Sequence, residues 1–221
     1  MQYLFLTLFF VSVIIHLYGS HKQNQKIRNY SKVFILFFLI LFYVFSFDSI
    51  KDINPILLSA LICCWIGDLL LIIKGLKPLI IGGTFFIFGH FLFIKLFSDN
   101  INVEKLNPFF IALFILIYTI AIALEIKFLQ PHLHKKLLPV LMIYLVTNMT
   151  MNLFALTLLT TEVSLSHFLI YLGAMSFFAS DSILFFVRFN KKSRVFGKHF
   201  WVMLTYSFAV ALITIGSVIN K

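Results

Sequence analysis

The sequence predicts an all-α membrane protein, a bundle of eight transmembrane helices that forms a single domain over residues 1–221. Of these residues, 61% are hydrophobic. Only 12% are charged, whereas a soluble domain carries about a quarter. Apolar runs long enough to cross a hydrocarbon core of about 30 Å recur along the whole chain. They leave no room for a soluble domain, so any chemistry must lie within the bundle or at its ends.

The first run lacks a positively charged leading segment and precedes a basic cluster, which favours a membrane anchor over a secretory signal. The second run is short and can begin near Lys32, whose long side chain can reach the interface. Prolines stand near the ends of the later runs and outside their centres, at positions 55, 78, 108, 131 and 139. We expect the spans at about residues 3–19, 33–47, 55–73, 79–97, 108–129, 137–160, 164–187 and 199–219.

The formal net charge of +10 would suggest a nucleic-acid partner in a soluble protein, but its placement indicates membrane topology instead. Basic residues gather in alternate loops, and the loops between them hold acids with few bases, which is the positive-inside pattern. The pattern predicts that both termini lie outside the cytoplasm, with no nucleic-acid partner. The inner-loop bases are Lys22, Lys26, Arg28, Lys32, Lys74, Lys77, Lys127, Lys135, Lys136, Arg188, Lys191, Lys192, Arg194 and Lys198.

Two aspartates, Asp68 and Asp181, stand inside the third and seventh spans. A charge at membrane depth is costly, and acids found there usually face a protein interior and carry a function. At a rise of about 1.5 Å per residue, they lie about 8 Å and about 10 Å from the cytoplasmic ends of their spans. Two carboxyls at matched depth that share a proton supply a general acid and a general base. The structural alternative is that each is neutralised by a lysine or by hydroxyls and only joins helices.

Other polar residues occupy the spans near this depth. His90 is a candidate proton relay or orienting group, although it can equally be a buried histidine bonded to a backbone carbonyl. Tyr144, Asn148 and Asn152 follow one helix face, which either lines a substrate groove or joins helices by hydrogen bonds. Tyr206 lies at a depth where it can donate a hydrogen bond to an aspartate. Lys32 can pair with an acid or a lipid phosphate, or extend to the interface. We expect Glu125 to pair with Lys127 or a basic loop, and we assign no role to His16, His132, His134 and His199.

Four segments match, in order and spacing, the motifs of a known family: ALICCWIGDLLL, GGTFFIFGHFLFIKLF, YLGAMSFFASDSILFFVRF and LTYSFAVALIT. Over about residues 30–215 the chain resembles the YhhN family of eight-helix membrane proteins, whose animal members include the lysoplasmalogenases. The resemblance places Asp68 and Asp181 at the two family aspartates and His90 at the histidine of its GHxxY motif. It also matches Lys32, Pro139, Tyr144, Met149 and Tyr206, whereas Val33, Phe93 and Val210 replace a proline, a tyrosine and a glutamine of the family pattern.

The resemblance implies an ether hydrolase that cleaves the vinyl ether of a lysoplasmalogen, giving a fatty aldehyde and glycerophospho-ethanolamine or -choline. Such bonds hydrolyse by protonation at carbon, followed by capture of the resulting cation by water, so a protonated acid beside a carboxylate is required. We expect Asp181 to be the acid and Asp68 the base, with the reverse assignment open. His90 and Tyr206 would orient them, while Lys32, Tyr144, Asn148 and Asn152 would contact the substrate.

A metal site is the less favoured alternative, because the chain has no HExxH or comparable ligand run and two aspartates with one histidine make a sparse site. The hydrolysis that the resemblance implies requires no metal or organic cofactor. The expected partners are a lysophospholipid and membrane lipids. The chain would lie in a cell membrane, if bacterial, with its site toward the cytoplasm. The main alternative is a proton-coupled transporter or lipid flippase that uses the intramembrane aspartates, and a weaker one is a lipid-binding scaffold.

Overall fold

The computed structural model describes residues 1–133, 137–189 and 198–219, and within these ranges it confirms the all-α class. Eight helices in the described part are long and apolar enough to cross a membrane, so the chain is an integral multi-pass membrane protein. The same described ranges include short 3₁₀ turns in or beside the loops: η1 (Ile50–Asp52), η2 (Val103–Lys105) and η3 (Gln130–His132). The helices are α1 (Gln2–His21), α2 (Gln25–Val44), α3 (Pro55–Ile72), α4 (Leu76–Ser98), α5 (Pro108–Leu129), α6 (Leu138–Thr161), α7 (Leu165–Phe189) and α8 (Lys198–Ile219).

Asparagine caps begin three of these helices. The Asn24 side-chain oxygen accepts hydrogen bonds from the backbone N–H groups of Lys26 and Ile27, and Asn54 and Asn107 each stand directly before a proline at the first helical position. Both features are typical of helix N-termini. Helix α2 therefore begins at Gln25 and ends at Val44, whereas the apolar run suggested residues 33–47. The apolar run marks only the lipid-compatible part of this helix, and its polar first turns extend beyond that part.

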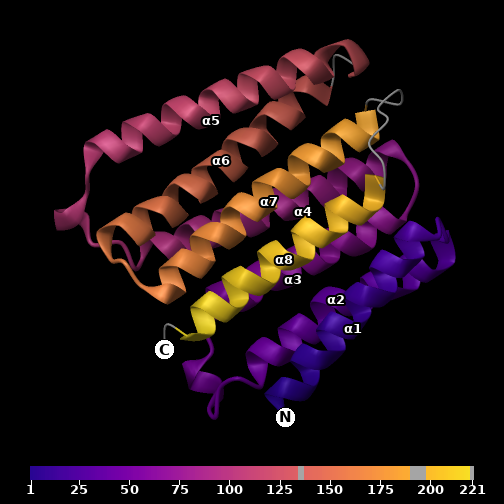
Figure 1. Ribbon diagram of the computed structural model, residues 1–221, viewed down its shortest axis with the longest axis horizontal. Helices are drawn as coiled ribbons and strands as arrows, with labels where there is room; N and C mark the ends of the chain where they lie inside the picture. The colour runs from indigo at the N-terminus through magenta and orange to yellow at the C-terminus, as the bar shows by residue number, and fades with distance from the viewer. Residues whose placement is uncertain (134–136, 190–197, 220–221) are drawn as a thin grey trace.

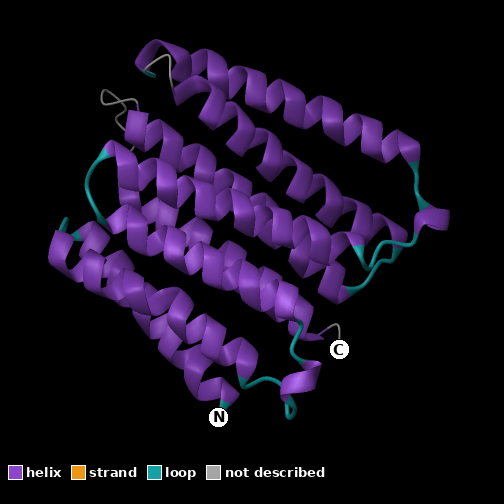
Figure 2. Cartoon of the chain, turned by 180° about the vertical axis from the view of Figure 1, so that it is seen from behind, coloured by secondary structure: helices purple, strands orange, loops and turns teal. Residues whose placement is uncertain are grey.

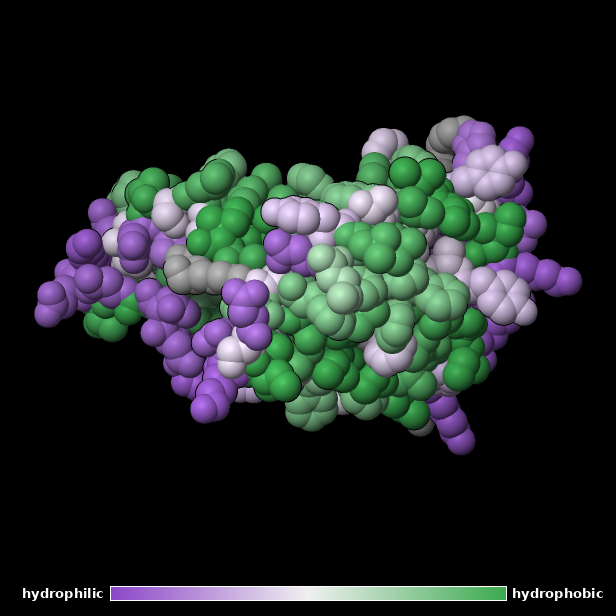
Figure 3. Space-filling model, turned by 90° about the horizontal axis from the view of Figure 1, so that it is seen from below, coloured by the Kyte–Doolittle hydropathy of each residue, from purple (hydrophilic) through white to green (hydrophobic). Residues whose placement is uncertain are grey.

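The helices pack in pairs that follow one another across the bundle (Figure 1). Helices α1 and α2 form one edge, α3 packs on α4, α7 packs on α8, and α5 and α6 form the opposite edge. Figure 2 shows the same order from behind, with long helices joined by short loops. Figure 3 shows a broad hydrophobic middle with hydrophilic residues at the two ends. This distribution is that of a bundle whose middle faces hydrocarbon and whose ends face water.

Close approach between α7 and α8 depends on two glycines. A Cβ atom added at Gly173 would lie 2.8 Å from the Ala209 carbonyl oxygen, and one at Gly216 would lie 2.8 Å from the Ser166 carbonyl oxygen. Small residues let membrane helices approach closely enough to pack backbone against side chain. Because the two helices are this close, the Ser166 hydroxyl donates a hydrogen bond to the Gly216 carbonyl, at 2.7 Å.

We expect Gly173→Ala to destabilise the protein by about 1–3 kcal/mol, because the added methyl meets backbone and forces α7 and α8 apart. The measurement is thermal or denaturant unfolding of the purified protein in one detergent. Gly83→Ala is the matched control, since a Cβ there meets nothing within 4 Å. Equal stability of the two variants would contradict this account of the α7–α8 contact.

Candidate active site

A cavity of about 300 Å³ lies between α1, α2, α3, α4, α7 and α8. Both aspartates line it: Asp68 from the last turns of α3 and Asp181 from α7. The lining also includes basic side chains, of which Lys74 and Arg188 are exposed near the ends of α3 and α7. The other basic or imidazole side chains of the lining are His16, Arg28, Lys32 and His199. A polar hollow with a basic rim therefore holds both carboxyls.

Asp68 is paired with a cation. The Lys32 ammonium lies 3.0 Å from Asp68 Oδ1, and the two side chains are 15% and 4% exposed. The Tyr206 hydroxyl lies beside the same carboxyl but forms no hydrogen bond with it. Neither Asp68 Oδ2 nor the Tyr206 oxygen has a hydrogen-bond partner among the described residues. Asp68 thus has a neutralising partner on one oxygen and an unused acceptor on the other.

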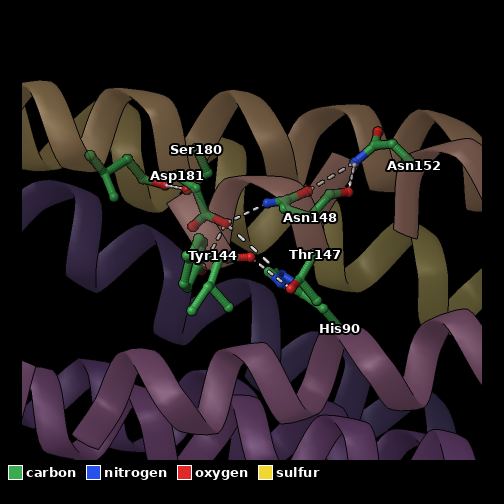
Figure 4. A network of polar contacts seen from close by, with 9 residues as sticks. His90, Tyr144, Thr147, Asn148, Asn152, Ser180 and Asp181 are labelled. Carbon is green, nitrogen blue, oxygen red and sulfur yellow. Dashed lines mark hydrogen bonds and ion pairs between the residues drawn. The ribbon is translucent and has the colours of Figure 1, made fainter. Parts of the chain in front are cut away.

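Asp181 has a different environment, made of neutral donors (Figure 4). Its Oδ2 accepts hydrogen bonds from the Tyr144 hydroxyl at 2.9 Å and from the Asn148 amide at 2.7 Å. The preceding residue, Ser180, donates to the Val202 carbonyl at 2.9 Å and so fixes this turn of α7 against α8. Asp181 is only 4% exposed. Two donors on α6 therefore hold one oxygen of this carboxyl at the cavity wall.

A chain of hydrogen bonds continues behind Asp181 toward α5. Asn148 Oδ1 accepts from the Asn152 amide at 2.9 Å, and Asn152 Oδ1 accepts from the Tyr118 hydroxyl at 3.0 Å. Asn148 and Asn152 are fully buried. We expected them to line a groove, but they are absent from the lining of the described cavities. They link α5 and α6 to Asp181 instead.

His90 lies behind the aspartate, away from the cavity surface. Its Nε2 is 4.0 Å from Asp181 Oδ2, and its ring is edge-on to Tyr144 and Phe177, with centroids 5.3 Å and 5.0 Å away. The side chain is fully buried, and neither ring nitrogen has a hydrogen-bond partner among the described residues. The carbonyl bond that a buried histidine commonly makes is thus missing. The Nε2 side of the imidazole faces Asp181 (Figure 4).

Two groups in this region were not anticipated from the sequence. Glu125, expected to pair with a basic residue, is buried in α5 and accepts a hydrogen bond from Ser182 at 3.0 Å. His16, given no role, is 3% exposed and lines the cavity. Its Nδ1 is 3.1 Å from the Ser31 oxygen, whose own proton goes to the Ile27 carbonyl. His16 Nδ1 therefore carries the hydrogen of that bond. The apolar pattern of α1 does not indicate which face meets the cavity, so the position of His16 could not be predicted. His134, which was also given no role, lies outside the described residues.

The structure brings most of the candidate residues together. Asp68, Asp181, Lys32 and Tyr206 line one cavity. Tyr144, which lines a separate and mostly apolar hollow, donates a hydrogen bond to Asp181. The arrangement offers one carboxyl beside a cation and one among neutral donors, which is suited to proton transfer between unlike groups. Within the described ranges, no three His, Cys, Asp or Glu side chains are grouped as ligands for a metal ion.

The model of the YhhN family matches residues 27–217, which covers α3 to α7 entirely and most of α2 and α8. This confirms the resemblance found in the two aspartate motifs. Helix α1, which contributes His16, lies before the matched residues. Comparison with curated proteins and with solved structures gave no match.

Proposed function

Because this chain belongs to the YhhN family, we propose that it is a membrane hydrolase that cleaves the vinyl ether bond of lysoplasmalogens. The products would be a fatty aldehyde and glycerophospho-ethanolamine or -choline. The family includes lysoplasmalogenases. The observation that carries the proposal is that Asp68 and Asp181 line one cavity in unlike environments, one beside Lys32 and the other among neutral donors.

The reaction adds water across an enol ether. An acid protonates the second carbon of the alkenyl chain, which leaves an oxocarbenium ion at the first carbon. Water attacks that carbon and loses a proton to a base, forming a hemiacetal. The hemiacetal then collapses to the aldehyde, and the glycerol oxygen leaves as a hydroxyl. The proton given by the acid stays on the chain, and the base gains one from water. Transfer of that proton from the base to the acid returns both groups to their starting states.

The surroundings of the aspartates favour Asp181 as the acid. Its Oδ2 is occupied by the Tyr144 and Asn148 donors, so we place the reactive proton on Oδ1. Asp68, neutralised by Lys32 at 3.0 Å, would be the carboxylate that stabilises the cation and accepts the proton from water. A fixed negative group is worth most where positive charge develops in a water-poor site.

The basic rim fits the other end of the substrate. Arg28, Lys74 and Arg188 line the same cavity as the carboxyls, and such groups attract a lipid phosphate. We infer that this rim faces the cytoplasm, since the positive-inside rule places basic loops there, with both termini on the opposite side. A lysolipid of the inner leaflet would then reach the site without crossing the membrane.

The test is release of aldehyde by the purified protein in detergent, with alkenyl and acyl lysophosphatidylethanolamine compared at equal concentration. We expect aldehyde from the alkenyl lipid alone. In heavy water, aldehyde trapped as it forms should carry one deuterium on its second carbon, because the acid protonates carbon. A carrier would release none in detergent, where no sealed compartment exists. Fatty acid from the acyl lipid, or unlabelled aldehyde, would contradict the proposed chemistry.

A further inference from the structure

A second hollow adjoins the polar cavity and is almost entirely apolar. It lies between the C-terminal ends of α3 and α7 and the N-terminal halves of α4 and α6. Four residues line both hollows: Leu71, Leu79, Phe86 and Leu184. We call the second hollow the apolar groove. The polar cavity and the apolar groove are therefore neighbouring parts of one surface.

The apolar groove is open to the lipid-facing surface of the bundle. Val140, on its α6 side, is 37% exposed, and Ile80 and Ile87, on its α4 side, are partly exposed. Tyr144 also lines it, and the hydroxyl of this tyrosine is the one that donates to Asp181. The groove thus runs from the bilayer to the carboxyl that we place at the reacting carbon.

We propose that the apolar groove binds the first part of the hydrocarbon chain of the lysolipid, which enters sideways from the bilayer, and that Gly83 sets the room available to it. The inference rests on the proposed function and deepens it. The lysolipid fits because the two hollows are continuous. The basic rim of the polar cavity can hold the phosphate, and the apolar groove on the other side of Asp181 can hold the chain attached to the same glycerol. A groove of about 60 Å³ holds only the carbons nearest the ether, so the rest of the chain remains in lipid.

The volume of the apolar groove depends on the absence of a side chain at Gly83. Gly83 lines the apolar groove, and a Cβ atom placed on it would meet nothing within 4 Å. Its neighbour Gly82 differs, because a Cβ there would lie 3.2 Å from the Gly67 carbonyl oxygen. A side chain at position 82 would thus crowd α3, whereas packing does not restrict position 83 to glycine. Because lipid chains are as apolar as the groove, its role is to position the chain, and moving the chain from bilayer to groove gains little energy.

The test uses an ether lysophosphatidylethanolamine with a saturated hexadecyl chain that carries a diazirine near its ether end. The full chain in phosphatidylcholine nanodiscs is irradiated with a trace of this probe, and adducts are located by mass spectrometry. We expect adducts on Ile80, Ile87 and Val140 that an excess of unlabelled hexadecyl lysolipid suppresses. Gly83→Phe should abolish them. Ile81→Phe, at a 50% exposed position of the same helix outside the groove lining, should leave them unchanged.

Labelling spread evenly over lipid-facing residues, or adducts on the groove that survive Gly83→Phe, would overturn the inference. If Gly83→Phe does not fold, Gly83→Ala and Gly83→Leu are tested instead. We expect labelling of the groove residues to fall with Gly83→Ala and to fall further with Gly83→Leu. The probe has no vinyl bond, so labelling does not require cleavage. Labelling without aldehyde release would refute the proposed function but support the groove as a chain-binding site. Aldehyde release without labelling would support the proposed function but refute the groove as a chain-binding site. On the alkenyl substrate, Gly83→Phe should slow release about 10²-fold, the cost of a displacement of about 1 Å.

Discussion

Replacing Asp181 by asparagine is expected to lower aldehyde release about 10³-fold, the middle of the range for loss of a general acid. Asparagine has the same shape, and its side-chain oxygen can still accept hydrogen bonds from Tyr144 and Asn148, so the α6–α7 contact should persist. The amide cannot donate a proton to carbon. The measurement is the initial rate of aldehyde release in detergent, with unfolding temperature recorded for the same samples.

Tyr144→Phe is the matched control for this prediction. It removes one hydrogen bond to Asp181 Oδ2 but keeps the carboxyl, so we expect a loss of only about tenfold, the value of one modest hydrogen bond. Asp68→Asn should lower the rate strongly as well, because it removes the carboxylate on the other side of the cavity. Full activity of Asp181→Asn in folded protein would remove this residue from the mechanism, and full activity of Asp68→Asn would remove that one.

Replacing Lys32 by methionine is expected to destabilise the protein by about 3–5 kcal/mol, the cost of leaving one member of a buried ion pair without its partner. Methionine preserves most of the side-chain volume and removes only the ammonium group 3.0 Å from Asp68. The Asp68 side chain is only 4% exposed, so a carboxylate left without the ammonium would be poorly solvated. The measurement is denaturant unfolding in a fixed detergent, at a pH where carboxylates of ordinary acidity are ionised.

The double variant Lys32→Met with Asp68→Asn provides the control, because it removes both charges and should recover most of the lost stability. Asp68→Asn alone should cost less than Lys32→Met, since the remaining lysine is 15% exposed and can turn toward the rim. If Lys32→Met were as stable as the unchanged protein, the pair would have no structural role. An equal loss in the single and double variants would locate the effect in the lysine stem and not in its charge.

The eight helices could be predicted from the sequence because lipid leaves a strong signal, a long run without charges. The start of α2 could not, because Gln25 to Lys32 form polar helical turns that extend beyond the apolar run. The true signal there is Asn24, whose side chain caps the helix. Hydropathy predicts the part of a helix that contacts lipid, whereas capping residues indicate where the helix begins outside that part.

The carboxyls and their neighbours could be predicted because polar residues at membrane depth are rare and must face inward. Which partner each would take could not be predicted from spacing. Asn148 and Asn152 share a face with Tyr144, yet the asparagines turn to each other and to α5 while the tyrosine borders the apolar groove. Glu125 has Lys127 nearby in the chain, but its partner is Ser182 on another helix. Such choices depend on helix rotation, which a hydropathy pattern does not fix.

The donors from Tyr118 to Asp181 all point the same way. Tyr118 gives its hydrogen to Asn152, Asn152 to Asn148, and Asn148 to Asp181 Oδ2. Dipoles aligned head to tail polarise one another, so their positive end falls on the carboxyl. Helix α5, at the outer edge of the bundle (Figure 1), is thereby linked by hydrogen bonds through α6 to Asp181 on α7. A tilt of α5 that withdraws the Tyr118 hydroxyl would break the first of these bonds and so weaken the polarisation of the amide that donates to Asp181.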